Sequence, residues 1–326
     1  MKLSEILDII TLDLEQVEKE LEENIGSIVP LAYEMSRYIL ESGGKRLRPS
    51  VLLLSSGACG LSNGKERINS AVAIELIHTA TLLHDDVVDE ADTRRGKRAS
   101  NVVWGSKASV LVGDFMLARA LGLLSSAGSL EVIKSVTDAA AKLAEGQVFE
   151  VMVAKNMVEV SEEICFEIIE NKTASLIESC GKVGAILASS NGETREALGN
   201  YGFNLGIAFQ LIDDALDYSA NEQEFGKKIG QDLHEGKMTL PLVYALRGAS
   251  SREKSIVMDV FQNNGFEKEE SDFVMDIVEK YNGVQQTKTV AQEFAEKAKR
   301  ALAGLPQNTC RKSLDLLADH VVERRA

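Results

Sequence analysis

The chain of 326 residues has few aromatic side chains, four prolines and four cysteines. The cysteines (Cys59, Cys165, Cys180 and Cys310) are scattered and form no CxxC pair, so the sequence shows no zinc-ligand spacing. Each is expected to be a small buried side chain in a reducing compartment. Useful stretches of alternating apolar and polar residues are also absent. Long segments rich in Ala, Leu, Glu and Lys remain, and they favour helix almost throughout.

The sequence lacks an excess of positive charge. Its net charge is −14, which argues against nucleic acid as a partner, because a phosphate backbone binds a basic surface. No apolar run reaches the roughly 18 residues that indicate a membrane span, and the acidic N-terminal segment is unlike a signal peptide. We therefore expect a cytoplasmic protein without a transmembrane segment, folded as one all-α domain over residues 1–326.

One apolar segment runs directly into a group of carboxylates. Residues 75–98 read ELIHTATLLHDDVVDEADTRRGKR, and Asp85, Asp86 and Asp89 follow the apolar part. On a helix predicted over residues 69–92, Asp85 and Asp89 share one face, and His78 lies close to that face. Carboxylates beside an apolar wall are costly to bury unless a cation meets them. A single motif of this kind is still more often a solvated helix face than a functional site.

The same spacing occurs a second time. Residues 209–218 read FQLIDDALDY, which places Asp213, Asp214 and Asp217 near the end of a helix predicted over residues 193–218. Two copies, each preceded by apolar residues, favour function over a solvated face. A small number of oxygen ligands suits Mg²⁺, which is usually held by one or two carboxylates together with substrate phosphates. The sequence thus predicts two acidic helix faces that bind a diphosphate through Mg²⁺.

Cations gather at the start of another predicted helix. Residues 43–49 read GGKRLRP, and Lys45, Arg46 and Arg48 precede a helix predicted over residues 50–59. Backbone N–H groups at a helix N-terminus favour anions, so this segment is a candidate anion site. A solvated loop with incidental charge explains the segment equally well when it is taken alone.

Five further candidate cationic residues lie outside this segment. Arg94 and Arg95 directly follow the first Asp motif. Lys172 and Thr173 fall within a helix predicted over residues 163–181, where a lone lysine more often extends its charge to solvent than serves a function. Residues 224–232 are glycine-spaced and include Lys227, and residues 235–241 read EGKMTLP and include Lys237.

Taken together, these motifs resemble those of the trans-isoprenyl diphosphate synthases over roughly residues 43–241. The first Asp motif has two intervening residues, as in the long-chain polyprenyl members, and HTATLLHDDVVDEADTRRG is most similar to the octaprenyl (C40) members. The resemblance implies an isoprenoid-synthase-type helical bundle with a central cavity between two Asp-rich helices. It also implies a homodimer.

The resemblance assigns a role to each polar motif residue. About two to three Mg²⁺ ions would be held by Asp85, Asp86, Asp89, Asp213, Asp214 and Asp217. The allylic diphosphate would contact Arg94, Lys172, Thr173, Gln210, Lys227 and Lys237. Isopentenyl diphosphate would contact Lys45, Arg48, His78 and Arg95. The catalytic set implied is Asp85, Asp86, Asp89, Lys172, Asp213 and Lys227.

The activity implied is Mg²⁺-dependent prenyl transfer. Isopentenyl diphosphate would be condensed repeatedly with an allylic diphosphate, farnesyl diphosphate being the expected starter, to give a long all-trans polyprenyl diphosphate for quinone side chains. Ala80 and Thr81, shortly before Asp85, are small and would leave a tunnel open for the growing chain. Simple helix packing explains Ala80 equally well. Release of the product would involve transient membrane contact.

Three alternatives remain open at this point. A shorter-chain (geranylgeranyl or farnesyl) synthase would use the same motifs. A class I terpene cyclase would ionise its substrate in the same way, but GGKRLRP and His78 argue against it because a cyclase needs no second diphosphate site. A non-catalytic helical subunit of a heteromeric synthase would be expected to lose acidic motifs, and this chain keeps both.

Overall fold

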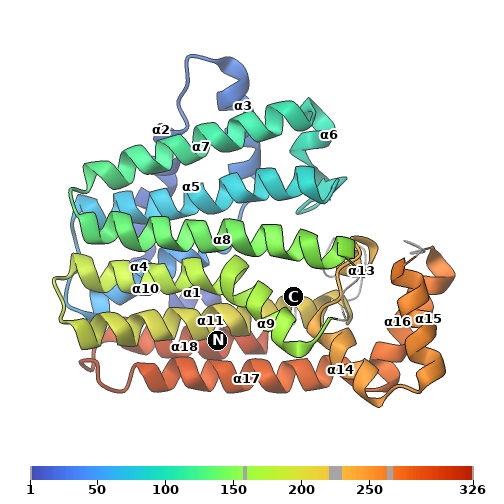
Figure 1. Cartoon of the computed structure of the whole chain (residues 1–326). Coiled ribbons are helices and arrows are strands. Elements are labelled where there is room, and N and C mark those ends of the chain that lie inside the picture. Colours follow the sequence, from blue (N-terminus) through green and yellow to red (C-terminus); the bar gives the residue numbers. More distant parts are fainter. Residues whose placement is uncertain (1, 157–159, 220–229, 263–266, 325–326) are drawn as a thin grey trace. The chain divides into compact units, whose positions relative to one another are not determined.

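The computed structural model describes residues 2–156, 160–219, 230–262 and 267–324 (Figure 1). The chain forms two compact units. Unit 1 comprises Met1–Ala140, Leu176–Gly202 and Ala301–Leu317, and unit 2 comprises Ala141–Ser175, Phe203–Arg300 and Ala318–Ala326. The first Asp motif and GGKRLRP belong to unit 1, and the second Asp motif belongs to unit 2. A single domain over the whole chain stays a prediction.

Helix predominates, as the sequence predicted. In chain order, the first elements are α1 (Leu3–Ile6), the 3₁₀-helix η1 (Asp8–Ile10), α2 (Thr11–Asn24), α3 (Pro30–Leu40), α4 (Leu47–Ala58), α5 (Lys65–Val88), β1 (Thr93–Arg94), β2 (Lys97–Arg98), α6 (Ser100–Trp104) and α7 (Ser106–Ser126). They are followed by α8 (Leu130–Asn156), α9 (Glu162–Ile169), the π-helical turn η2 (Glu170–Ala174), α10 (Ser175–Leu187), α11 (Gly192–Asp217), α13 (Gln231–His234), α14 (Leu240–Gly248), α15 (Ser251–Gln262), α16 (Lys268–Lys280), α17 (Gly283–Ala301) and α18 (Thr309–Glu323).

Helix α5 forms the centre of unit 1. It packs against α7, α4 and α2 (Figure 1), and its residues from Arg67 to Ile77 are buried on every side. Helix α10 approaches α4 so closely that a Cβ atom on Gly184 would lie 2.7 Å from the backbone oxygen of Leu52. Glycine is therefore needed at this crossing. The first Asp motif is thus carried at the end of a helix that is buried on every side along part of its length.

The helix predicted over residues 69–92 has wrong bounds at both ends, and α5 begins earlier than predicted, at Lys65. Helix α5 ends at Val88 rather than at residue 92, because Asp89 leaves the helical conformation and Glu90 takes a left-handed φ of 50°. After α5 the chain forms the antiparallel hairpin of β1 and β2, in which Thr93 pairs with Arg98. Both loop residues have positive φ, as a type I′ turn requires, so Arg95 stands at the tip of the hairpin.

The helix predicted over residues 163–181 is not continuous. Helix α9 passes through the π-helical turn η2 before α10 begins, and Lys172 and Thr173 lie in that turn. A Cβ atom on Gly146 of α8 would lie 2.7 Å from the backbone nitrogen of Lys172, so α8 runs in direct backbone contact with the wide turn. Single π-helical turns inside α-helices often mark functional positions.

The core of unit 2 surrounds the end of α11. Its buried side chains include Ile169 of α9, Leu211 and Leu216 of α11, Tyr244 of α14 and Ala291 of α17. These contacts fix the second Asp motif between apolar helices, as the apolar run before it predicted.

Among the described residues, one helix is long and apolar enough to span a membrane by length and composition. It is α7, with a mean hydropathy of 1.5 in its most apolar window, of which 33% is buried. The same test is passed by core helices of proteins that cross no membrane, and α7 packs along α5.

Candidate active site

The GGKRLRP segment of unit 1 is fixed by Arg46. This residue takes a left-handed φ of 48° just before α4. Its guanidinium group donates to Glu18 of α2 (Nη2 to Oε2, 2.9 Å) and to the buried Glu75 of α5 (Nη1 to Oε1, 3.0 Å). The positive charge of Arg46 is therefore balanced inside the protein, and its role is to join three helices.

Other cations of unit 1 meet around His78. The guanidinium group of Arg95 lies against Gly44, where an added Cβ atom would be 3.0 Å from its Nη1. Burial lowers the pKa of His78 well below its usual value, and the charges of Arg48 and Arg95 lower it further. His78 is therefore neutral and can both donate and accept a hydrogen bond. The structure thus brings together Arg48, His78 and Arg95, while Lys45 is exposed on the same segment.

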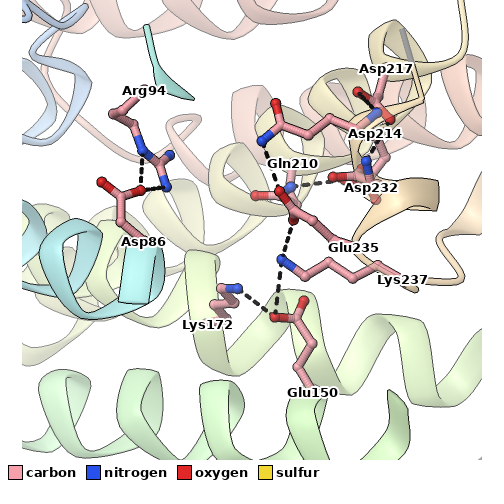
Figure 2. A network of polar contacts seen from close by, with 11 residues as sticks. Asp86, Arg94, Glu150, Lys172, Gln210, Asp214, Asp217, Asp232, Glu235 and Lys237 are labelled. Atoms are coloured by element: carbon pink, nitrogen blue, oxygen red, sulfur yellow. Dashed lines mark hydrogen bonds and ion pairs between the residues drawn. The ribbon is translucent and has the colours of Figure 1, made fainter. Parts of the chain in front are cut away.

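The three carboxylates of the first Asp motif differ in their surroundings. Asp86 is completely buried, and its Oδ1 accepts a hydrogen bond from Nε of Arg94 at 2.7 Å (Figure 2). Asp85 and Asp89 are partly exposed. The resemblance implied that Asp86 binds a metal and that Arg94 binds a diphosphate. In the structure the two side chains form an ion pair with each other.

Unit 2 contains a cavity of about 450 Å³ next to the second Asp motif. Six of its polar lining residues are Glu150, Lys172, Thr173, Gln210, Asp214 and Lys237. Four of these six residues were predicted to contact the allylic diphosphate, so the structure brings this part of the predicted site together. Lys227 lies outside the described residues.

A chain of hydrogen bonds links the π-helical turn to the second Asp motif. The hydroxyl group of Thr173 donates to Oε1 of Gln210 at 2.9 Å. In turn, Nε2 of Gln210 donates to Oδ1 of Asp214 at 2.8 Å (Figure 2). Gln210 thereby fixes the orientation of one carboxylate. Burial raises the pKa of Asp214 to about 7, and the neighbouring Asp213 and Asp217 add to this rise while the Gln210 hydrogen bond opposes it.

The other two carboxylates of this motif have backbone and arginine partners. Asp217 accepts hydrogen bonds from the backbone N–H groups of Gln231 (3.2 Å) and Asp232 (3.0 Å), so it caps the N-terminus of α13. Oδ1 of Asp213 lies 2.6 Å from Nη2 of Arg324. Burial, together with the charges of Asp217 and Asp214, also raises the pKa of Asp232 well above its usual value.

Three residues of this region were not predicted as site residues. Arg324 is far from every motif in the sequence, and no local pattern indicates it. Asp232 lies within the glycine-spaced segment but outside the motif spacing. Glu150 lies one helical turn after Gly146 on the same face of α8, and no sequence motif indicates it.

These carboxylates fit Mg²⁺ bound jointly with a diphosphate. No three His, Cys, Asp or Glu side chains converge to enclose a metal in the described part of the chain. Mg²⁺ does not need such an enclosure, because it is commonly held by one or two carboxylates and substrate phosphates. Asp85 and Asp89 offer partly exposed oxygens in unit 1, and the crowding of Asp213, Asp214 and Asp217 in unit 2 favours a cation.

Comparison with known proteins places the chain among the prenyltransferases of the isoprenoid-synthase fold. The sequence model described as polyprenyl synthetase matches residues 29–280. The octaprenyl diphosphate synthases of Haemophilus influenzae and Escherichia coli are each 40% identical over 99% of this chain and cover 98% and 99% of their own lengths, respectively. A polyprenyl synthase from Caulobacter crescentus, crystallised with calcium and isoprenyl diphosphate, matches with a TM-score of 0.95 and 36% identity over 100% of this chain and 98% of that chain.

The chain therefore belongs to the polyprenyl synthetase family. The resemblance inferred from the motifs and the all-α fold class are both confirmed.

Proposed function

We propose that the chain is a Mg²⁺-dependent polyprenyl diphosphate synthase that extends farnesyl diphosphate with isopentenyl diphosphate to octaprenyl diphosphate (C40). The observation that carries this proposal is the 40% identity, over nearly the whole chain, to two octaprenyl diphosphate synthases. The retention of both Asp motifs at the same spacing supports catalysis by this chain itself and argues against a non-catalytic subunit.

The proposal assigns the motif residues to the two substrates as follows. Arg48, neutral His78 and Arg95 hold isopentenyl diphosphate, together with Lys45. Lys172, Thr173, Gln210 and Lys237 hold the allylic diphosphate, together with Arg94 and Lys227. Mg²⁺ is held by Asp85, Asp89, Asp213 and Asp214 and, when bound, stabilises the negative charge that develops on the leaving diphosphate. The observed partners of Asp86 and Asp217 favour positioning roles for these two carboxylates.

The reaction needs no protein nucleophile. The allylic C–O bond breaks, and its electron pair leaves with the diphosphate, so that an allylic carbocation remains. The double bond of isopentenyl diphosphate attacks this cation, and the neighbouring carbon loses a proton that the released diphosphate accepts. Lysine and arginine side chains stabilise the leaving group, while apolar helical walls exclude the water that would quench the cation.

The test is to incubate the purified chain with farnesyl diphosphate, labelled isopentenyl diphosphate and Mg²⁺, and to measure the products by mass. The expected result is a C40 product. A main product of C20 would support the shorter-chain alternative, and turnover without isopentenyl diphosphate would support a cyclase. Activity only after addition of a second protein would support the non-catalytic subunit.

We further propose that the enzyme is a homodimer that meets its partner through α7. The exposed side of α7 carries apolar side chains among polar ones: Val110, Leu111 and Leu121 are 39%, 67% and 52% exposed, respectively, and Asp114 and Arg119 are exposed as well. Large exposed apolar side chains on one helix are candidates for burial against a protein partner. A second copy of the chain is the partner that the family resemblance implies.

We also propose that the enzyme is cytoplasmic and that it contacts a membrane transiently when the apolar product leaves.

The double variant Leu111→Arg/Leu121→Arg tests this interface. Because two charges in an apolar interface are costly to bury, we expect the mass in solution to fall from twice the 35.5 kDa of one chain to a single chain. Light scattering after size exclusion measures this. Leu12→Arg is the matched control, since Leu12 is 80% exposed on α2. A dimer that survives the double variant would contradict the assignment of α7.

A further inference from the structure

Glu150 of α8 connects two lysines of the proposed allylic diphosphate site. Nζ of Lys172 lies 2.6 Å from Oε2 of Glu150, and Nζ of Lys237 lies 3.9 Å from the same oxygen. Figure 2 shows the carboxylate between the two ammonium groups. Lys237 also pairs with Glu235 at 2.7 Å. The two lysines come from separate elements, the π-helical turn η2 and the segment before α14, so no local geometry fixes their separation.

The position of Glu150 follows from the packing of α8 on the π-helical turn. Gly146 brings the two backbones together, because any Cβ atom there would lie 2.7 Å from the Lys172 nitrogen and 2.9 Å from Cβ of Asn171. Glu150 is four residues further along α8 and therefore on the same face. The close approach at Gly146 thus directs Glu150 onto Lys172.

The carboxylate of Glu150 reduces the electrostatic repulsion between the ammonium groups of Lys172 and Lys237. Two ammonium groups in one mostly buried site repel each other, since the side chains of Lys172 and Lys237 are only 21% and 15% exposed. A shared oxygen offsets this repulsion and holds both groups at one wall of the cavity that also contains Asp214. Because Glu150 already holds the two ammonium groups close together, they need not be ordered when the diphosphate binds.

We propose that Glu150 is a positioning residue that preorganises Lys172 and Lys237 for the allylic diphosphate. It acts through the two lysines and does not contact the reacting atoms. The inference rests on the proposed function insofar as the two lysines bind that diphosphate.

The test compares Glu150→Gln with the wild-type chain by calorimetric titration of farnesyl diphosphate in the presence of Mg²⁺ and without isopentenyl diphosphate. The amide keeps the size of the side chain but removes its charge. We expect farnesyl diphosphate to bind about tenfold more weakly and its KM to rise similarly, while the KM for isopentenyl diphosphate changes less than about twofold. Glu145→Gln is the matched control, because Glu145 is an exposed glutamate five residues earlier on α8, and this variant should leave both values unchanged.

A double-variant cycle separates positioning from a general structural role. If Glu150 acts through the lysines, Glu150→Gln should have little further effect on farnesyl diphosphate binding in a Lys172→Ala/Lys237→Ala background. Unchanged or tighter binding by Glu150→Gln would overturn the inference, as would an equal rise in both KM values. Failure of the wild-type chain to bind farnesyl diphosphate would instead contradict the proposed function.

Discussion

Alanine at Asp85 or at Asp213 is expected to lower turnover by about a thousandfold. Each substitution removes an oxygen that would hold Mg²⁺ on the leaving diphosphate, and loss of such charge stabilisation in a water-excluded site has effects of this order. Steady-state rates with farnesyl and isopentenyl diphosphates measure the effect. Both side chains are partly exposed, so the helical circular dichroism and the melting temperature should stay close to those of the wild-type chain.

Two controls accompany these variants. Asp92→Ala removes an exposed carboxylate shortly after the first motif and should leave turnover within about twofold. Arg324→Ala removes the observed partner of Asp213 but keeps the carboxylate, so it separates loss of the ion pair from loss of the metal ligand. Near-native rates for Asp85→Ala or Asp213→Ala would contradict the metal assignment.

Phenylalanine at Ala80 is expected to shorten the product. Ala80 is completely buried in α5, five residues before Asp85. If the growing chain passes this position, an aromatic ring would close its path, and the C40 product would give way to shorter ones while the first condensations continue. Mass analysis of the products checks the result. Thr81, whose hydroxyl group donates to the backbone oxygen of His78 at 2.7 Å, lies beside it.

The control for Ala80→Phe is Ala71→Phe. Ala71 is equally buried on α5 but lies on the opposite side of the helix, nine residues earlier. Both variants overpack the helix and should lose about 1–3 kcal/mol of stability. Only Ala80→Phe should change the product length. Equal product lengths from both variants would place the tunnel elsewhere.

The sequence predicted those features that depend on local patterns. The apolar periodicity identified the helices that carry both Asp motifs, and the repeat of the motif identified the acidic groups themselves. The end of α5 was missed because Glu90 adopts a left-handed conformation that non-glycine residues seldom take. The π-helical turn was missed because residues on both sides of Lys172 keep an ordinary helical apolar pattern.

Contacts between distant parts of each unit could not be read from the sequence. Arg46 pairs with Glu18 and Glu75 and therefore has a structural role in unit 1. Its neighbours in GGKRLRP carry the same charge, so the sequence could not show that Arg46 differs from them. Arg324 reaches Asp213 across 111 positions of the chain. Glu150 belongs to no sequence motif, and its role depends on where the fold places Lys172 and Lys237. Tertiary packing determines each of these pairs, and the local pattern of a single sequence does not predict them.

The most direct test of the account is the dependence of wild-type turnover on a divalent cation. The purified chain, stripped of metal with EDTA, is incubated with farnesyl and labelled isopentenyl diphosphates, and Mg²⁺ is then added back. If the two Asp motifs act by holding Mg²⁺ on the diphosphate, product is absent in EDTA and returns to the full rate with Mg²⁺. Full activity in EDTA would contradict the account.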